Sequence, residues 1–374
     1  MGIYLGLTMT HKYKTNSIIS LALVTSIFTL PCHAILINLN DIGGAAPGSL
    51  AGDAFQEAAN IWSSVLIDPV EINLDVGFST LAGNILGSTS SSSQNFSYSS
   101  IRTALLADSL SIDDQIATSF LQAGPNLNFL SNNPNATNFF DNNNTTNNQF
   151  MSVNTANLKA LGLLANNNTS DGSVTFNNTI SFDFFSGDGI DPGSYDFVGI
   201  AMHEIGHALG FVSGVDTIDT FSGNGPNANQ VPSFDPFSIN TTLDLFRYSN
   251  ESLLNGLSIP DIAVGDRGQY FSIDGGTTPL ALFATGRYNG DNRQASHWKD
   301  NLGFGLMDPT FSTGEIGQLS AADLLAFDVI GFDVSLPLEI SNANTLWLVL
   351  LPFMFLLYRK LKTEVKSIHI KTQN

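Results

Sequence analysis

The stretch that decides the fold is Phe197-Val-Gly-Ile-Ala-Met-His-Glu-Ile-Gly-His-Ala-Leu-Gly-Phe211. Asp196 precedes it at a favoured N-cap position, and Gly210 follows its last helix-forming residue. These signals predict a helix over residues 197–209. The apolar residues of this stretch recur at helical spacing, which predicts a helix packed in the interior. They are Phe197, Ile200, Ala201, Ile205 and Ala208.

Two histidines of this helix, His203 and His207, are four residues apart and therefore lie on one face, one turn apart. Their imidazoles can bind the same zinc ion. Glu204 lies beside them and is directed toward the open position of the metal, where it can act as general base and then as acid. The H-E-x-x-H pattern predicts a zinc hydrolase, most simply a peptidase. Without a metal, burial of these three side chains would be costly.

A third ligand must come from elsewhere in the chain. Of the other histidines, three fall in the ends of the chain: His11, His33 and His369. His297 is the remaining one and lies in Ala295-Ser-His-Trp-Lys-Asp300. Asp216, Asp219 or a glutamate of the body are alternative third ligands, because carboxylates also bind zinc.

The run from His203 to Phe211 resembles the metzincin pattern H-E-x-x-H-x-x-G-x-x-H, with Gly210 at the glycine that turns the chain below the metal. The sequence departs from that pattern at Ser213, where the third histidine normally stands. A long insertion before a Ser-His-Trp sequence, followed by a Leu-Met-x-Pro turn, is similar to the leishmanolysin branch. The resemblance implies that His297 is the third ligand and that Met307 is the Met-turn residue.

The resemblance also implies the architecture, an α+β fold of the two-lobed zincin type. The upper lobe, about 35–212, would hold a mixed sheet and helices. The insertion and an irregular lower lobe would occupy about 213–334. A closing helix with Ser320 as N-cap would end the catalytic domain, which spans 35–334.

Local patterns predict further elements. Helices are expected over 54–65, 101–110, 112–121 and 155–164, a strand over 70–78, and a strand or strand pair over 173–184. The serine-rich stretch 87–100 is expected to be a loop or flexible hairpin. The asparagine-rich stretch 126–148 is expected to be an exposed loop, because asparagine favours turns.

The two ends of the chain predict export. Residues 1–34 have the basic, apolar and small-residue regions of a signal peptide, and its cleavage would remove Cys32, the only cysteine. Residues 335–374 form a linker, an apolar run over 346–358 and a basic tail. This tail resembles the PEP-CTERM sorting tails of exported bacterial proteins. We therefore expect a secreted or surface-anchored protein, with membrane contact through the apolar run.

Charge limits the partners. Residues 35–344 contain 32 acidic and seven basic residues, a formal charge of −25 that disfavours nucleic acid. A protein or peptide substrate and a monomer are expected.

Two further candidate sites are weaker. Asp188 and Asp191, among glycines, could bind calcium, although a plain turn is the alternative. Tyr270 and Tyr288 are available to assist oxyanion binding, but nothing selects either.

Together these features predict an exported zinc endopeptidase with Glu204 as its general base, a secreted bacterial metzincin-like metalloprotease. The alternative is a surface adhesion or matrix module that retains a structural or degenerate zinc site, which would suit the acidic, asparagine-rich composition. A structural site would be closed by a fourth protein ligand, whereas a catalytic site keeps that position open.

Overall fold

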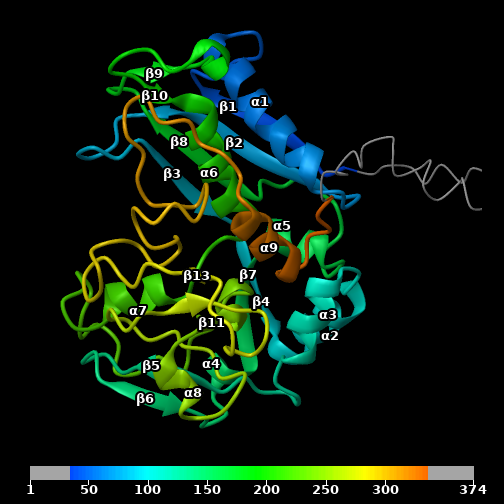
Figure 1. The fold of residues 1–374 in the computed structure, drawn as a ribbon, viewed down its shortest axis with the longest axis vertical. Coiled ribbons are helices and arrows are strands. Elements are labelled where there is room, and N and C mark those ends of the chain that lie inside the picture. The colour runs from blue at the N-terminus through cyan, green and yellow to red at the C-terminus, as the bar shows by residue number, and fades with distance from the viewer. Residues whose placement is uncertain (1–33, 336–374) are drawn as a thin grey trace, which may run out of the picture. The chain divides into compact units, whose positions relative to one another are not determined.

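A computed structural model describes residues 34–335, and this part of the chain is mixed α and β, which confirms the coarse fold class (Figure 1). The predicted signal peptide and sorting tail concern residues outside this range. Among the described residues, no helix combines the length and apolar character needed to cross a membrane.

The main sheet has four strands in the order β1 (Leu36–Gly43), β2 (Glu71–Ser79), β8 (Gly172–Asn177) and β3 (Gly87–Ser91). The first three are parallel, and β3 pairs antiparallel with β8 at the edge. Strand β2 confirms the strand expected over 70–78, and its alternate residues Ile72, Leu74 and Val76 are fully buried. Strand β1 was not anticipated.

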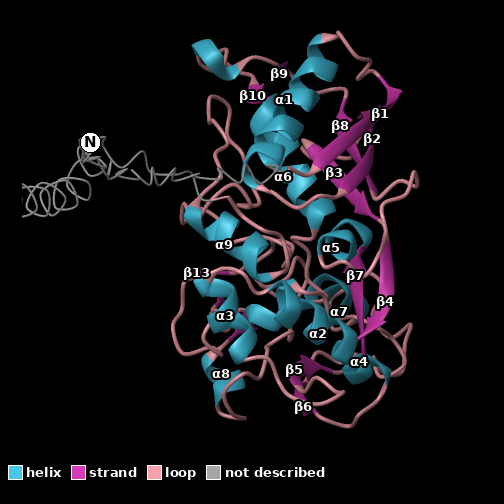
Figure 2. Ribbon diagram, turned by 90° about the vertical axis from the view of Figure 1, so that its right-hand side faces the viewer, coloured by secondary structure: helices cyan, strands magenta, loops and turns pink. Residues whose placement is uncertain are grey.

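Helices α1 (Leu50–Val65) and α6 (Phe197–Leu209) pack against each other on one face of this sheet (Figure 2). Helix α1 begins four residues before the expected residue 54, because the Ser49 hydroxyl caps it by accepting a hydrogen bond from the Gly52 amide. The Trp62 indole donates to the Met202 carbonyl at 2.9 Å. The motif helix is therefore held as a buried, fixed element.

The serine-rich stretch is not a flexible hairpin, and that prediction is wrong. It forms β3 and β4 (Ser93–Ser97), which pair with different partners, β8 and β7 (Phe150–Asn154). Its hydroxyls bond to the motif helix: Thr89 Oγ1 lies 2.8 Å from the Glu204 carbonyl oxygen, and Ser91 Oγ donates to the His207 carbonyl. Small polar residues form strands here because their side chains satisfy backbone groups of a neighbour.

The asparagine-rich stretch is also structured, contrary to the expected exposed loop. It contains β5 (Phe129–Asn132), β6 (Asn138–Asp141) and α4 (Thr146–Gln149). Asn147 and Asn148 are buried, and their amides donate to the Asp141 carboxylate and the Leu127 carbonyl. A buried amide is tolerated when it is hydrogen-bonded in this way.

Most remaining elements follow the predictions closely. Helices α2 (Tyr98–Asp108) and α3 (Ile112–Ser119) are confirmed, whereas α5 (Thr155–Ala160) is shorter than expected. The 173–184 region is a strand pair in two sheets, since β9 (Phe182–Asp183) pairs with β10 (Tyr195–Asp196). The closing helix is α9 (Ala321–Val329), and the predicted Ser320 cap is confirmed with a full capping box.

Asp196 does stand at the N-cap position of α6, but its side chain does not cap the helix. Its Oδ2 instead accepts a hydrogen bond from the Gly317 amide at 2.9 Å. The carboxylate therefore links the start of the motif helix to the segment that precedes α9.

The segment between the motif helix and α9 contains only short elements. They are α7 (Val215–Phe221), η2 (Leu243–Phe246), β11 (Arg247–Tyr248), α8 (Asn250–Leu253), β12 (Tyr270–Phe271) and β13 (Ala281–Leu282). A separate short 3₁₀ turn, η1 (Ser186–Asp188), lies before α6. Arg247 is fully buried, and its guanidinium donates to the Ala284 carbonyl at 2.8 Å. Buried polar bonds, together with apolar packing, hold this irregular region together.

Candidate metal centre

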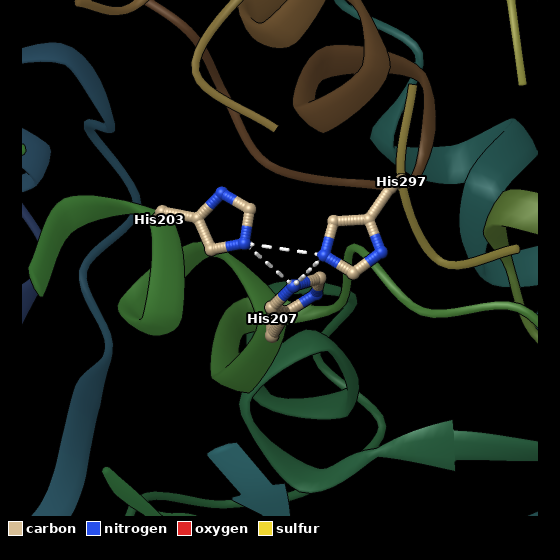
Figure 3. A group of neighbouring side chains, drawn as sticks. All are labelled: His203, His207 and His297. Atoms are coloured by element: carbon tan, nitrogen blue, oxygen red, sulfur yellow. Dashed lines mark hydrogen bonds between the residues drawn. The ribbon is translucent and has the colours of Figure 1, made fainter. Parts of the chain in front are cut away.

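The structure brings together the three histidines that the sequence selects (Figure 3). Helix α6 supplies His203 and His207, and His297 arrives from the loop after β13. Their Nε2 atoms form a triangle with separations of 3.1, 3.1 and 3.2 Å. All three side chains are buried. His297, which stands 90 positions after His207 in the sequence, thus lies against the other two imidazoles.

Backbone carbonyls set the tautomer of each ring. The Nδ1 atoms of His203, His207 and His297 lie 2.8, 2.7 and 3.1 Å from the carbonyl oxygens of Leu306, Phe211 and Gln294, respectively. A carbonyl only accepts, so each Nδ1 must carry the proton and each neutral ring presents a lone pair at Nε2. The three Nε2 atoms therefore cannot donate to one another. Three lone pairs converge on one point, which favours a cation there.

A zinc ion fits this donor set. A tetrahedral ion with bonds of about 2.0–2.1 Å holds its ligand nitrogens roughly 3.3 Å apart, close to the separations here. Burial lowers the pKa of His203 to about 4 and that of His207 to about 3, and it lowers the pKa of His297 as well. All three rings stay neutral near pH 7, which is the form that binds metals.

Glu204 lies in the same cleft and is held by the edge strand of the sheet. Its Oε2 accepts a hydrogen bond from Thr89 Oγ1 at 2.7 Å. Gly87 leaves room for the carboxylate, because a Cβ there would lie 2.8 Å from Glu204 Oε1. Burial raises the pKa of Glu204 to about 7, and the Thr89 hydrogen bond opposes that shift. A carboxylate with such a pKa suits proton transfer near neutral pH.

Met307, the residue that the resemblance names as the Met-turn residue, packs against Gly206 of the motif helix. It is fully buried, and its Sδ would lie 2.7 Å from a Cβ built on Gly206. The buried Asp323 of α9 fixes this turn by accepting from the Leu306 and Met307 amides and from the Trp298 indole. The Asp323 carboxylate therefore joins α9 to two residues beside the histidines. Trp298 follows His297 in the sequence, and the carbonyl of Leu306 bonds to the His203 ring.

Asp216 and Asp219, the alternative ligands, do not reach the metal centre. The Asp216 carboxylate accepts from the Ala295 and Ser296 amides, next to His297. Asp219 accepts from the Tyr288 and Asn289 amides. Both side chains thus hold backbone in place. Among the described residues, the three histidines are the one group of acidic, cysteine or histidine side chains spaced to hold a metal ion.

Gly210 and Ser213, at the end of the motif, have structural roles. Gly210 takes a positive φ of 144° as the helix ends, which favours glycine. The Ser213 amide donates to the Ser296 hydroxyl, and the Ser213 hydroxyl donates to Asp244. Ser213 therefore braces the loop that carries the third histidine.

Other expected residues lie elsewhere. The Tyr270 hydroxyl is buried and donates to the Gly276 carbonyl, and Tyr288 is exposed outside the lining of the cleft. Asp188 ends a single helical turn, and the Asp191 amide donates to Asp183. This arrangement matches the turn alternative for that glycine-rich stretch, so no calcium site is proposed.

The triad lines a cleft of about 900 Å³, together with residues of β3, residues 292–294 and Pro309–Phe311. Sequence reasoning missed several lining residues, chiefly Thr89, Tyr195, Arg287 and Arg293. The scarcity of basic residues could have drawn attention to the two arginines. Thr89 carries no sequence signal, because its role depends on how β3 pairs.

Comparison of the chain with models of known families, with curated proteins and with solved structures finds no significant match. Support for a metal ion at this site comes from the chain's own geometry: three converging Nε2 atoms, the tautomers of their rings and the adjacent Glu204 carboxylate.

Proposed function

We propose that this protein is an exported zinc endopeptidase of the metzincin-like, two-lobed type. The main sheet with α1 and α6 would form the upper lobe, and the segment after residue 212 the lower lobe with α9. The observation that carries the proposal is the converging Nε2 triad of His203, His207 and His297, with Glu204 beside it at a cleft. The expected signal peptide and sorting tail support export and surface attachment.

Each residue then has a distinct task. When bound, zinc supplies a Lewis acid that polarises a peptide carbonyl and makes a water molecule more acidic. Glu204, oriented by Thr89, takes the proton from the attacking water and delivers it to the departing amine. The carbonyl oxygens of Leu306, Phe211 and Gln294 keep the three rings in the tautomer that presents Nε2.

The alternative, a module with a structural zinc site, is less well supported. A structural site normally has four protein ligands. Within residues 34–335 the group holds only three candidate ligands, which leaves one position open toward the cleft. A carboxylate with a pKa near neutrality is also unnecessary in a structural site.

The test compares the full-length wild type with Glu204→Gln and with Glu57→Gln, a matched change on the exposed side of α1. We expect Glu204→Gln to reduce cleavage of an unfolded protein by about 10²–10⁴-fold while it retains one zinc ion per chain. Glu57→Gln should retain full activity. Equal cleavage by the wild type and Glu204→Gln would rule out the mechanism, and so would the absence of zinc from the purified wild type.

A further inference from the structure

The cleft beside the triad has the opposite charge balance to the rest of the molecule. Residues 34–335 contain 31 acidic and seven basic residues. Two of those seven, Arg287 and Arg293, line the cleft, whereas Glu204 is its single acidic lining residue. Charges at the walls of a cleft act more strongly on a ligand than scattered surface charges do, because the protein excludes part of the solvent.

The loop that carries both arginines is held in one conformation. Gly286 and Arg293 form a β-bridge, and the Gly286 amide donates to the Arg293 carbonyl at 3.1 Å. The buried Asp219 accepts from the Tyr288 and Asn289 amides, both at 2.8 Å. Gly286 packs against the same carboxylate, since a Cβ there would lie 2.9 Å from Asp219 Oδ1. The backbone beside Arg287 is therefore fixed relative to the cleft.

The two guanidinium groups differ in availability. Arg293 donates to the Asp300 carboxylate at 2.8 Å, so much of its charge is already compensated. Arg287 is exposed, and in the part of the chain that the structure describes no carboxylate lies within ion-pair distance of it. Its guanidinium carbon lies 5.7 Å from the centre of the Tyr288 ring. Arg287 can thus pair with a ligand without breaking an internal ion pair.

We propose that Arg287 forms a subsite for an acidic side chain of the peptide substrate. This inference rests on the proposed peptidase function and assigns its preference. The planar guanidinium presents paired N–H donors that match a carboxylate. A lysine side chain at the same position would meet a like charge. Because of the positive charge at Arg287, this acidic protein would cleave acidic segments of its substrate in preference to basic ones.

The experiment uses quenched fluorescent peptides of eight residues that carry a single Glu, Gln or Lys at each position in turn. The zinc-loaded full-length protein should show a kcat/KM for Glu about five- to tenfold above that for Gln at one position, with Lys below Gln. In Arg287→Gln the Glu/Gln ratio should fall to near one, and in Arg287→Glu the order of Glu and Lys should reverse. A matched control is Lys299→Gln, since Lys299 pairs with Asp266 and Asp291, both outside the cleft lining, and it should keep the wild-type ratio.

A binding measurement separates failure of the subsite from failure of the function. The same peptides are bound to Glu204→Gln, with and without Arg287→Gln, and followed by fluorescence anisotropy at low and high salt. Tighter binding of the Glu peptide that weakens with salt and depends on Arg287 supports the subsite. Cleavage or binding without preference between Glu and Gln overturns it. If the wild type cleaves none of the peptides but binding still depends on Arg287, the peptidase function is overturned and the acidic-ligand subsite stands.

Discussion

At the residue scale, one carboxylate that could have been a metal ligand, Asp216, holds the backbone beside His297 instead. Asp216 accepts from the Ala295 amide at 2.7 Å and from the Ser296 amide at 3.1 Å, the two residues before His297. The Ser296 hydroxyl donates to Asp216 as well and accepts from the Ser213 amide. This cluster of hydrogen bonds fixes the backbone that places the His297 ring against His203 and His207.

Asp216→Asn should therefore weaken zinc binding. The amide of asparagine would direct N–H donors at groups that themselves donate, so the 295–297 backbone would shift. We expect a loss of about 10–100-fold in zinc affinity, the usual effect of disturbing groups that orient a metal ligand. Competition with a chromophoric chelator measures it. The control is Asp219→Asn, which alters the 288–289 backbone and should leave zinc affinity unchanged; equal losses in both variants would contradict this account.

At the scale of elements, the motif helix is held in place by close packing against α1 and against the turn that contains Met307. Gly206 faces Met307 and α1, and a Cβ there would lie 2.7 Å from Met307 Sδ and 3.3 Å from Trp62 Cζ2. The helix accepts a glycine in its interior, despite the weaker helix propensity of glycine, because a larger residue would separate the helix from Met307. The Leu306 carbonyl that orients His203 belongs to that turn.

Gly206→Ala should accordingly destabilise the fold by about 1–3 kcal/mol, the usual effect of overpacking a filled core. Urea unfolding of the zinc-free protein isolates this packing effect from metal binding. The double variant Gly206→Ala with Met307→Ala provides the control. It should show a favourable coupling energy, since the smaller residue makes room for the methyl group. No destabilisation by Gly206→Ala would mean that α6 and the turn are more loosely packed than the structure shows.

At the scale of the whole molecule, the triad links parts of the chain that are distant in sequence. His203 and His207 belong to α6, which packs on the main sheet. His297 belongs to the segment after β13. A cation bound by all three rings would stabilise the folded state relative to the unfolded chain, where the ligands are far apart.

Removal of the metal should therefore lower thermal stability. Zinc at 100 times its dissociation constant contributes about 2.7 kcal/mol, so a chelator should lower the Tm and added zinc should restore it. Differential scanning calorimetry measures both steps. His297→Ala should have a Tm that responds much less to chelator. A wild-type Tm that is insensitive to chelator would argue against metal binding at the triad.

A second contact joins the connection between α1 and β2 to the end of the described chain. Leu66 and Val334 form a β-bridge, the Ile67 amide donates to the Asp333 carbonyl, and the Asp333 amide donates to the Asp68 carboxylate. Burial, with Asp333 and Asp108 nearby, raises the pKa of Asp68 to about 8. Burial likewise raises the pKa of Asp108 to about 7.

These raised pKa values predict how stability depends on pH. Between about pH 4 and 8 the folded protein binds more protons at Asp68 than the unfolded chain does, so this contribution to the free energy of unfolding declines as pH rises. Asp68→Asn should remove most of that decline. Urea unfolding of the wild type and the variant at pH 5, 7 and 9 measures the difference. The same slope in both proteins would show that Asp68 does not titrate as expected.

The apolar spacing of 197–209, with Gly210 behind it, was enough to predict α6 and the places of His203 and His207. The prediction for the serine-rich stretch 87–100 was wrong, because the pairing of β3 depends on β8, more than 80 residues further along the chain.

The amino-acid sequence by itself determined the local features: a helix, the residues at which it begins and ends, and two imidazoles one turn apart. These follow from backbone geometry and from neighbours within a few residues. Only the tertiary structure decided which distant groups meet them, including the Thr89 hydroxyl at Glu204, the Asp216 carboxylate behind His297, and the carbonyls that set the ring tautomers. The physical reason is that a hydrogen bond depends on distance and direction in space, and sequence separation carries neither.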